Sequence, residues 1–152
     1  MLTKIVSGGQ TGADRAALDV AIKAGFPYGG WIPNGRLTEE GFLSEEYLLQ
    51  EMPTKDYPKR TEKNVVDSDG TVIISHGKLS GGSDYTRKMA EKHSKAWLHL
   101  DLAKMSLDYA VRLLKTWIID NDIRTLNVAG PRASKDPAIY AVTVKILECL
   151  LK

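Results

Sequence analysis

The chain has 152 residues, and its 21 lysines and arginines nearly balance its 19 aspartates and glutamates, for a formal net charge of +2. This length predicts one domain over residues 1–152, because a single hydrophobic core commonly serves about 100–200 residues. A lone cysteine excludes a disulfide framework, and the small net charge argues against a nucleic-acid binder. No apolar run reaches the roughly 18 residues of a membrane span, and no signal-peptide layout precedes the first strand. We therefore expect a soluble, cytoplasmic protein.

Short apolar runs alternate with longer helical patterns along the chain. The last helix begins with an N-cap signal at Asp136 and proline at its first position, Pro137. In chain order we expect a strand at 3–7, a helix at 12–24, an extended piece around 31–32, a short helix at 60–67, a strand at 71–75, a helix at 81–93, a strand at 96–100, a helix at 106–120, a strand at 125–129 and the last helix from 136.

Repetition of strand, glycine-rich turn and helix calls for parallel strands joined by right-handed crossovers. The fold class is therefore α/β, a Rossmann-like three-layer sandwich with a central, mostly parallel sheet of about five strands. Ligands of such sheets bind beyond the carboxyl ends of the strands, where the topology reverses. Residues 33–58, which we call the flap, lack clear periodicity and are too long for a plain connection, so we expect a functional loop there.

The first strand leads into a loop at 7–12, with the sequence SGGQTG, and then into a helix. Glycines let the backbone approach a ligand, and the first-turn amides present the positive end of the helix dipole. This predicts anion binding, although the loop matches neither the dinucleotide fingerprint nor the P-loop. Asp14, in the first helical turn, is placed either to cap the helix or to accept hydrogen bonds from ligand hydroxyls.

Two more loops follow strands. Residues 79–86 contain a pair of glycines and the hydroxyl groups of Ser83 and Thr86, which are suited to bind phosphate oxygens. Residues 130–134 carry Arg132, which is either an anion ligand or an exposed surface arginine. The flap and the helix after it add Arg36, Arg60 and Asn64. The candidate ligand-binding residues are Gly8, Gly9, Gln10, Thr11, Gly12, Asp14, Arg36, Arg60, Asn64, Ser75, Gly81, Gly82, Ser83, Thr86, Gly130 and Arg132.

Other polar residues give weaker signals. The three histidines have no metal-ligand spacing, and Cys149 lies in an apolar helix end typical of a core thiol. No catalytic triad is apparent from the order of residues. We expect Glu39, Glu40 and Glu45 to be exposed to solvent.

Four segments together resemble the family of molybdenum carrier proteins. They are the run SGGQTGADRAALD at 7–19, GGWIPNGR at 29–36, RTEKNVVDSDGT at 60–71, and Gly81-Gly82-Ser83 with Thr86. These segments span residues 7–86 in the family's order, and the whole chain agrees with the family's usual single-domain length.

What this resemblance implies is a Rossmann-like domain related to the lysine-decarboxylase-like proteins and to phosphoribohydrolases that activate cytokinins. Members of the wider group bind nucleotides or nucleotide-derived ligands at two glycine motifs, and many are homo-oligomers. The carrier name implies molybdenum cofactor (molybdopterin), an anionic pterin that would pass to molybdoenzymes. The hydrolase motif is altered, with Ser80 for its proline and Arg87-Lys88 for its acidic residues, which argues against that hydrolysis.

Three hypotheses follow. The first is a carrier without catalytic residues that binds molybdenum cofactor, or otherwise a nucleotide-like anion. The second is an enzyme acting on a nucleotide or nucleotide sugar, with Asp14 or Asp69 as acid or base. The third is a nucleotide-sensing module whose ligand changes its binding to partners.

Overall fold

A computed structural model describes residues 1–152, and a five-stranded sheet lies at its centre. The strands run in the order β2-β1-β9-β7-β8, and every neighbouring pair is parallel. Their bounds are Lys4–Val6 for β1, Tyr28–Gly29 for β2, Gly70–Ser75 for β7, Ala96–Asp101 for β8 and Thr125–Ala129 for β9. The predicted α/β class with a parallel sheet of five strands is confirmed.

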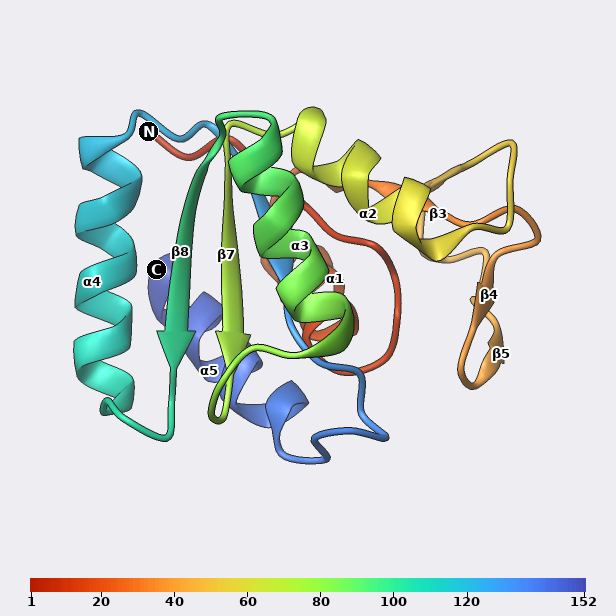
Figure 1. The fold of residues 1–152 in the computed structure, drawn as a ribbon. Helices are drawn as coiled ribbons and strands as arrows, with labels where there is room; N and C mark the ends of the chain where they lie inside the picture. The colour runs from red at the N-terminus through yellow and green to blue at the C-terminus, as the bar shows by residue number, and fades with distance from the viewer.

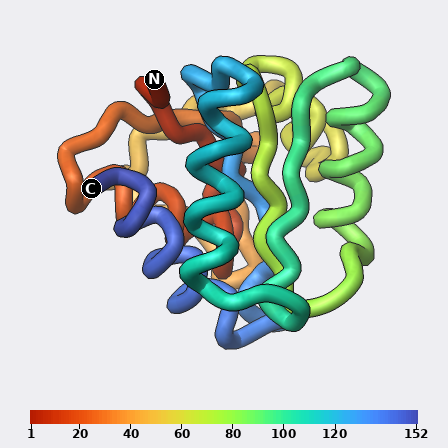
Figure 2. The backbone as a smooth tube through the Cα atoms, turned by 90° about the vertical axis from the view of Figure 1, so that its left-hand side faces the viewer, coloured from red at the N-terminus to blue at the C-terminus, as the bar shows by residue number.

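Helices cover both faces of this sheet and complete the three layers (Figure 1). On one face α1 (Ala13–Ala24), α4 (Leu107–Asp120) and α5 (Ile139–Leu150) share the main hydrophobic core with the strands. On the other face α2 (Tyr57–Val66) and α3 (Gly81–Lys92) pack together around a smaller cluster. Figure 2 shows the strands between α4 and α5 on one side and α3 on the other.

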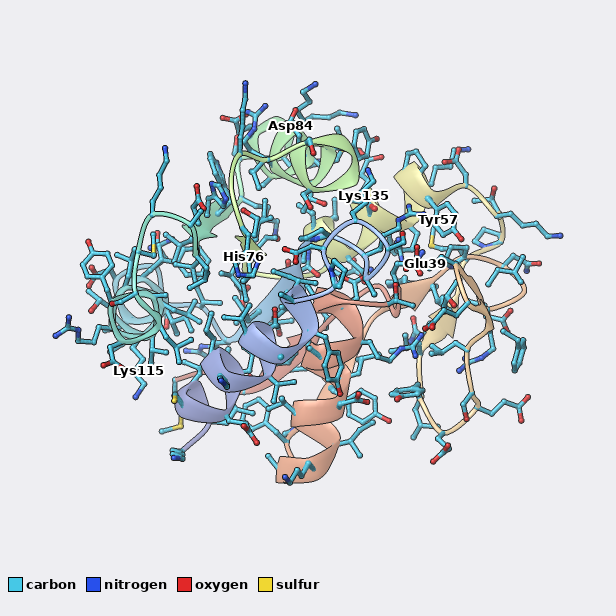
Figure 3. All side chains as sticks on the ribbon, turned by 90° about the horizontal axis from the view of Figure 1, so that it is seen from below. Glu39, Tyr57, His76, Asp84, Lys115 and Lys135 are labelled. Atoms are coloured by element: carbon cyan, nitrogen blue, oxygen red, sulfur yellow. The ribbon has the colours of Figure 1, made fainter.

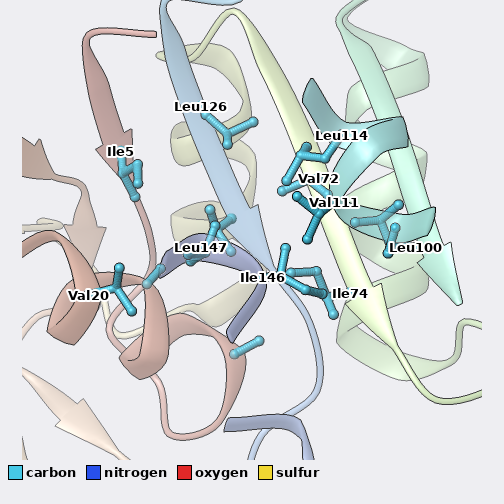
Figure 4. Packing of buried hydrophobic residues seen from close by; sticks show 14 of the residues in the cluster. Ile5, Val20, Val72, Ile74, Leu100, Val111, Leu114, Leu126, Ile146 and Leu147 are labelled. Atoms are coloured by element: carbon cyan, nitrogen blue, oxygen red, sulfur yellow. The ribbon is translucent and has the colours of Figure 1, made fainter. Parts of the chain in front are cut away.

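The main core comprises 17 buried residues, among them Ile74, Leu114 and Ile146, which meet between the sheet and α4 and α5 (Figure 4). Truncating one of these side chains to alanine costs about 2–5 kcal/mol of stability. Helix α1 packs closely on the sheet through alanines and ends at Gly25, which has a left-handed φ of 64° and donates its N–H to Ile22. The helix therefore holds its first turn firmly beside β1.

Two helix starts differ from their sequence predictions. Helix α2 begins at Tyr57 rather than near 60, so the flap ends inside it. Helix α5 begins at Ile139 rather than at Pro137, because Asp136 Oδ1 accepts the N–H of Ala138 and caps a separate turn. The prediction of Asp136 as the N-cap of this helix was therefore wrong by two residues.

The flap contains short strands of its own. β3 (Trp31–Ile32) pairs in parallel with β6 (Gln50–Glu51), and β4 (Leu37–Thr38) pairs with β5 (Gly41–Phe42) in a hairpin that projects from the body of the molecule in Figure 1. None of the helices is long and apolar enough to cross a membrane.

Candidate functional site

A cavity of about 290 Å³ opens at the carboxyl edge of the sheet. Its walls are the loops after β1, β7 and β9, together with one face of α2 and the first turns of α3. These loops meet because β9 lies between β1 and β7 in the sheet. The cavity is lined by eleven of the sequence-predicted residues: Gly8, Gln10, Asp14, Arg60, Asn64, Ser75, Gly82, Ser83, Thr86, Gly130 and Arg132. Their contact with a ligand remains a prediction.

Arg60 carries a buried positive charge into the cavity wall. It projects from α2, is only 7% exposed, and donates through Nη1 to the carbonyl oxygen of Gly8. Its guanidinium also lies 5.4 Å from the ring centre of Tyr57. Burial lowers the pKa of Arg60, and the nearby Asp14 carboxyl opposes this shift. The cation is thus held in place without a salt bridge.

Asp14 faces the same cavity from the first turn of α1. Its Oδ2 accepts the N–H of Gln10 at 3.3 Å, while Oδ1 has no hydrogen-bond partner in the chain. Burial raises the pKa of Asp14 to about 6, although the charge on Arg60 acts in the opposite direction. The carboxyl does not cap its helix through a side-chain bond to the N-terminal residues of α1. Of the two sequence interpretations, the structure favours a side chain with a free oxygen beside the cavity.

The N-terminus of α3 also opens on the cavity. Ser80 stands at its N-cap position but makes no side-chain cap, and the Ser83 hydroxyl makes no hydrogen bond in the chain. Lys135 reaches across from the loop after β9, because its Nζ lies 2.7 Å from where a Cβ on Gly81 would stand. An ammonium group beside the positive end of a helix is electrostatically unfavourable unless an anion lies near both. This end of the cavity is thus electrostatically suited to an anion.

Four cations line the cavity in all, since Lys78 and Arg132 join Arg60 and Lys135. None of the four forms a salt bridge within the chain. A histidine and an aspartate, His76 and Asp136, also line it and pair with each other at 2.7 Å. Figure 3, a view onto the carboxyl edge, places His76 and Lys135 near the centre of that edge and Lys115 at its periphery.

Five predicted residues lie outside the cavity lining, and Arg36 departs furthest from its expected role. Its guanidinium is buried and donates to the backbone carbonyls of Leu43, Ser44 and Tyr47. Arg36 does not line the cavity, and its Nε and Nη2 groups hold the flap together, so the structure does not bring it to the other predicted residues.

The other four residues shape the loops. Gly9 packs against side chains of the flap, and Gly81, with a left-handed φ of 52°, begins α3 beside Lys135. Gly12 has a φ of 79°, and a Cβ there would collide with the carbonyl of Pro131. Thr11 donates through Oγ1 to Glu39 and accepts the N–H of Ala133 at 3.0 Å. Gly12 and Thr11 thus join the first loop to the third.

Glu39 lies at the surface, as expected, yet it is not a free solvated side chain. Its carboxylate accepts hydrogen bonds from Thr11, from the Ser134 hydroxyl at 2.5 Å and from the Ser134 N–H at 3.1 Å. These bonds hold the pKa of Glu39 below its usual range. Glu39 therefore fastens the flap to two of the three cavity loops.

Asp69, the alternative acid or base, lies at the opposite edge of the sheet, directly before β7. Its Oδ2 accepts the N–H groups of Arg124 at 3.0 Å and Thr125 at 2.8 Å. The carboxylate therefore ties two strand ends together and does not line the cavity.

Sequence reasoning missed several lining residues, namely Thr61, His76, Lys78, Asn127, Lys135 and Asp136. Some had usable signals. His76 directly follows the predicted strand at 71–75, and Asn127 lies between the apolar Leu126 and Val128 of β9, where its amide donates to Thr71 Oγ1 at 3.2 Å. Lys135 and Asp136 lie just beyond the end of the predicted third loop, so a longer loop would have included them.

The parallel sheet with helices on both faces defines an α/β protein of the Rossmann-like class. Within that class, the chain belongs to the circularly permutated YpsA SLOG family, whose model matches residues 5–151. It is also similar to a solved structure described as "Putative molybdenum carrier protein" from Syntrophus aciditrophicus SB, with 60% identity and a TM-score of 0.98. The similarity covers 99% of this chain and 96% of that one. A comparison with curated proteins finds no match.

Proposed function

We propose that this protein is a carrier that binds an anionic, phosphate-bearing small molecule in the cavity, and that its cargo is molybdenum cofactor. The observation that carries the proposal is the set of four cations around one cavity, none of them paired with a carboxylate. A ligand with two or more negative charges would neutralise them. The likeness to a protein described as a molybdenum carrier supports the choice of cargo.

The residues present suit such a cargo. A molybdopterin is anionic at its phosphate and at its oxo-metal centre, and oxyanions are bound by guanidinium groups, ammonium groups and free helix amides. The N-terminus of α3 with Lys135 fits the phosphate, and Arg60 with Arg132 fits a second anionic group. The volume of about 290 Å³ lies at the small end of ordinary ligand cavities, so we expect a ligand that extends past the rim.

The remaining parts of the proposal concern context. We propose a cytoplasmic homo-oligomer that hands its cargo to molybdoenzymes. Size-exclusion chromatography with light scattering tests the oligomer, and a monomer at micromolar concentration would exclude it. A nucleotide remains the alternative ligand, and thermal shifts with nucleotides in the absence of any shift with cofactor would favour it.

Purification from a host that makes molybdenum cofactor tests the cargo. We expect pterin fluorescence and molybdenum to purify with the wild-type protein. Lys135→Ala should lower affinity for supplied cofactor about ten- to a hundredfold, the effect of losing a hydrogen bond to a charged group. The matched control is Lys115→Ala, because Lys115 is an exposed lysine on α4 that does not line the cavity. Absence of bound pterin, together with no binding of supplied cofactor, would refute the proposal.

A further inference from the structure

The pair formed by His76 and Asp136 is a feature of the cavity that carriage of a ligand does not require. His76 is the first residue after β7, and Asp136 lies between β9 and α5. The imidazole Nδ1 lies 2.7 Å from Asp136 Oδ2, although the two residues are 60 positions apart. Both residues line the cavity. The pair is therefore part of the binding site.

Asp136 is held in position from two sides. Its Oδ1 accepts the N–H of Ala138 at 3.0 Å while its Oδ2 faces the imidazole, and its side chain is only 17% exposed. A carboxylate that accepts from Nδ1–H fixes the neutral imidazole in the tautomer with a free lone pair on Nε2. No group of the chain bonds to Nε2. This is the arrangement of a positioned general base, in which a third group orients the base.

The position of the pair indicates what the base would act on. His76 and Lys78 begin the loop that leads into α3, and Asp136 directly follows Lys135, whose ammonium group lies over Gly81. The imidazole thus shares a rim of the cavity with the cations and the free helix amides to which we assign the phosphate. Asp14 faces the same cavity from the loop after β1.

We propose that His76 is a catalytic general base, positioned by Asp136, and that the protein hydrolyses phosphate monoesters bound in this cavity. This inference rests on the phosphate site of the proposed function. Its substrates are monoesters of nucleotide-like ligands, because a molybdopterin cargo has to keep its phosphate. Water attacks phosphorus and gives a proton to Nε2, while the P–O bond to the ligand breaks. The leaving oxygen takes a proton from the Asp14 carboxyl. The products are inorganic phosphate and the free alcohol, and solvent restores both protonation states.

The chain offers a matched control. His93 pairs with Glu62 through Nε2 at 2.7 Å, so it forms the same kind of histidine–carboxylate pair. That pair joins α2 to α3 outside the cavity lining. His93→Gln therefore removes an equivalent interaction without touching the proposed base.

The test measures phosphate release from p-nitrophenyl phosphate, flavin mononucleotide and guanosine monophosphate, in the presence of a chelator that silences contaminating metal-dependent phosphatases. We expect wild-type protein to release phosphate from at least one of them. His76→Gln should lower kcat at least about a hundredfold with little change in KM, since a general base contributes 10²–10⁴-fold. Asp136→Asn should lower kcat about tenfold, Asp136→Glu should recover part of the loss, and His93→Gln should match the wild type.

The inference is overturned if wild-type protein releases no phosphate from any of the three esters, or if His76→Gln turns over as fast as the wild type. Broadening of the ³¹P resonance of inorganic phosphate separates the two proposals. Phosphate binding without turnover would remove this inference and leave the proposed function intact. Absence of both binding and turnover would remove both.

Discussion

The Arg60 guanidinium donates a hydrogen bond to the carbonyl oxygen of Gly8, which joins α2 to the loop after β1 across 52 positions of the chain. A Cβ on residue 8 would collide with this guanidinium. Backbone conformation is not the reason for glycine here, because Gly8 does not have a left-handed φ. The glycine is therefore required for the close approach of a buried cation, and the left-handed turn of the loop is made by Gly9, with a φ of 75°.

Arg60→Gln should weaken binding of inorganic phosphate or cofactor at least about tenfold, because it removes a desolvated cation from the cavity wall. Isothermal titration calorimetry measures the change. Arg112→Gln, on the exposed face of α4, is the control and should leave affinity unchanged. Equal affinity of the Arg60 variant and the wild type would show that the anion lies elsewhere.

Asp14→Asn should stabilise the protein at neutral pH. The pKa of this carboxyl rises from 3.8 to about 6 on folding, so the folded state binds the proton more tightly. Proton binding to Asp14 therefore adds to the free energy of unfolding. This contribution is fully present below pH 3.8 and is lost as the pH rises through 6. Two pKa units correspond to about 3 kcal/mol at pH 7.5. The variant should therefore gain nothing in Tm at pH 3.5 and several degrees at pH 7.5.

Thermal unfolding across that pH range tests this prediction. Asp120→Asn, an exposed carboxyl at the end of α4, is the control and should show no such pH dependence. If the gain in Tm of the Asp14 variant is the same at both pH values, the carboxyl is not protonated on folding.

Gly12→Ala should destabilise the protein by about 2 kcal/mol or more. Residue 12 has a φ of 79°, and a Cβ there would meet the backbone of the loop after β9, including Ala133 N at 2.9 Å. Chemical denaturation measures the loss. Gly82→Ala is the control for the second glycine loop, because nothing lies within 4 Å of a Cβ at that position. A stability of Gly12→Ala equal to the wild type would mean that these loops separate readily.

Glu39→Gln should loosen the flap, because an amide NH2 group replaces one carboxylate oxygen. This group is a donor and cannot accept the hydrogen bond from Thr11 or Ser134. Trypsin cleavage within 33–58 should become several-fold faster, whereas Glu40→Gln, whose side chain makes no hydrogen bond, should be cleaved at the wild-type rate. The lowered pKa of Glu39 means that the wild-type contact persists above that pKa and is lost as the pH falls through it. Identical digestion of both variants would contradict this role.

The sequence predicted the elements well because their signals are local. Helix α1 shows its alanine spacing and its Gly25 stop within a dozen residues, and β7 is a continuous β-branched run. Loops that directly follow such strands, like that of Gly8, were predicted for the same reason. The rule that ligands bind beyond the carboxyl ends then located the cavity.

Contacts between residues that lie far apart in the sequence could not be predicted in this way. Arg36 is an arginine in a functional-looking loop, and only the path of the flap brings three carbonyls to it. His76 and Asp136 meet because β7 and β9 are neighbours, an order that no local pattern encodes. Asp69 was a candidate acid or base because of its residue type. It precedes β7, however, and therefore lies at the edge of the sheet opposite the cavity.

The insertion of β9 between β1 and β7 has a consequence for biosynthesis. The two glycine loops belong to strands that do not touch each other, and β9, the strand that joins them, follows both of them in the chain. A nascent chain that ends before Thr125 therefore has both loops but no cavity. If the cavity binds a ligand as we propose, binding should therefore appear abruptly once β9 has been added to the sheet.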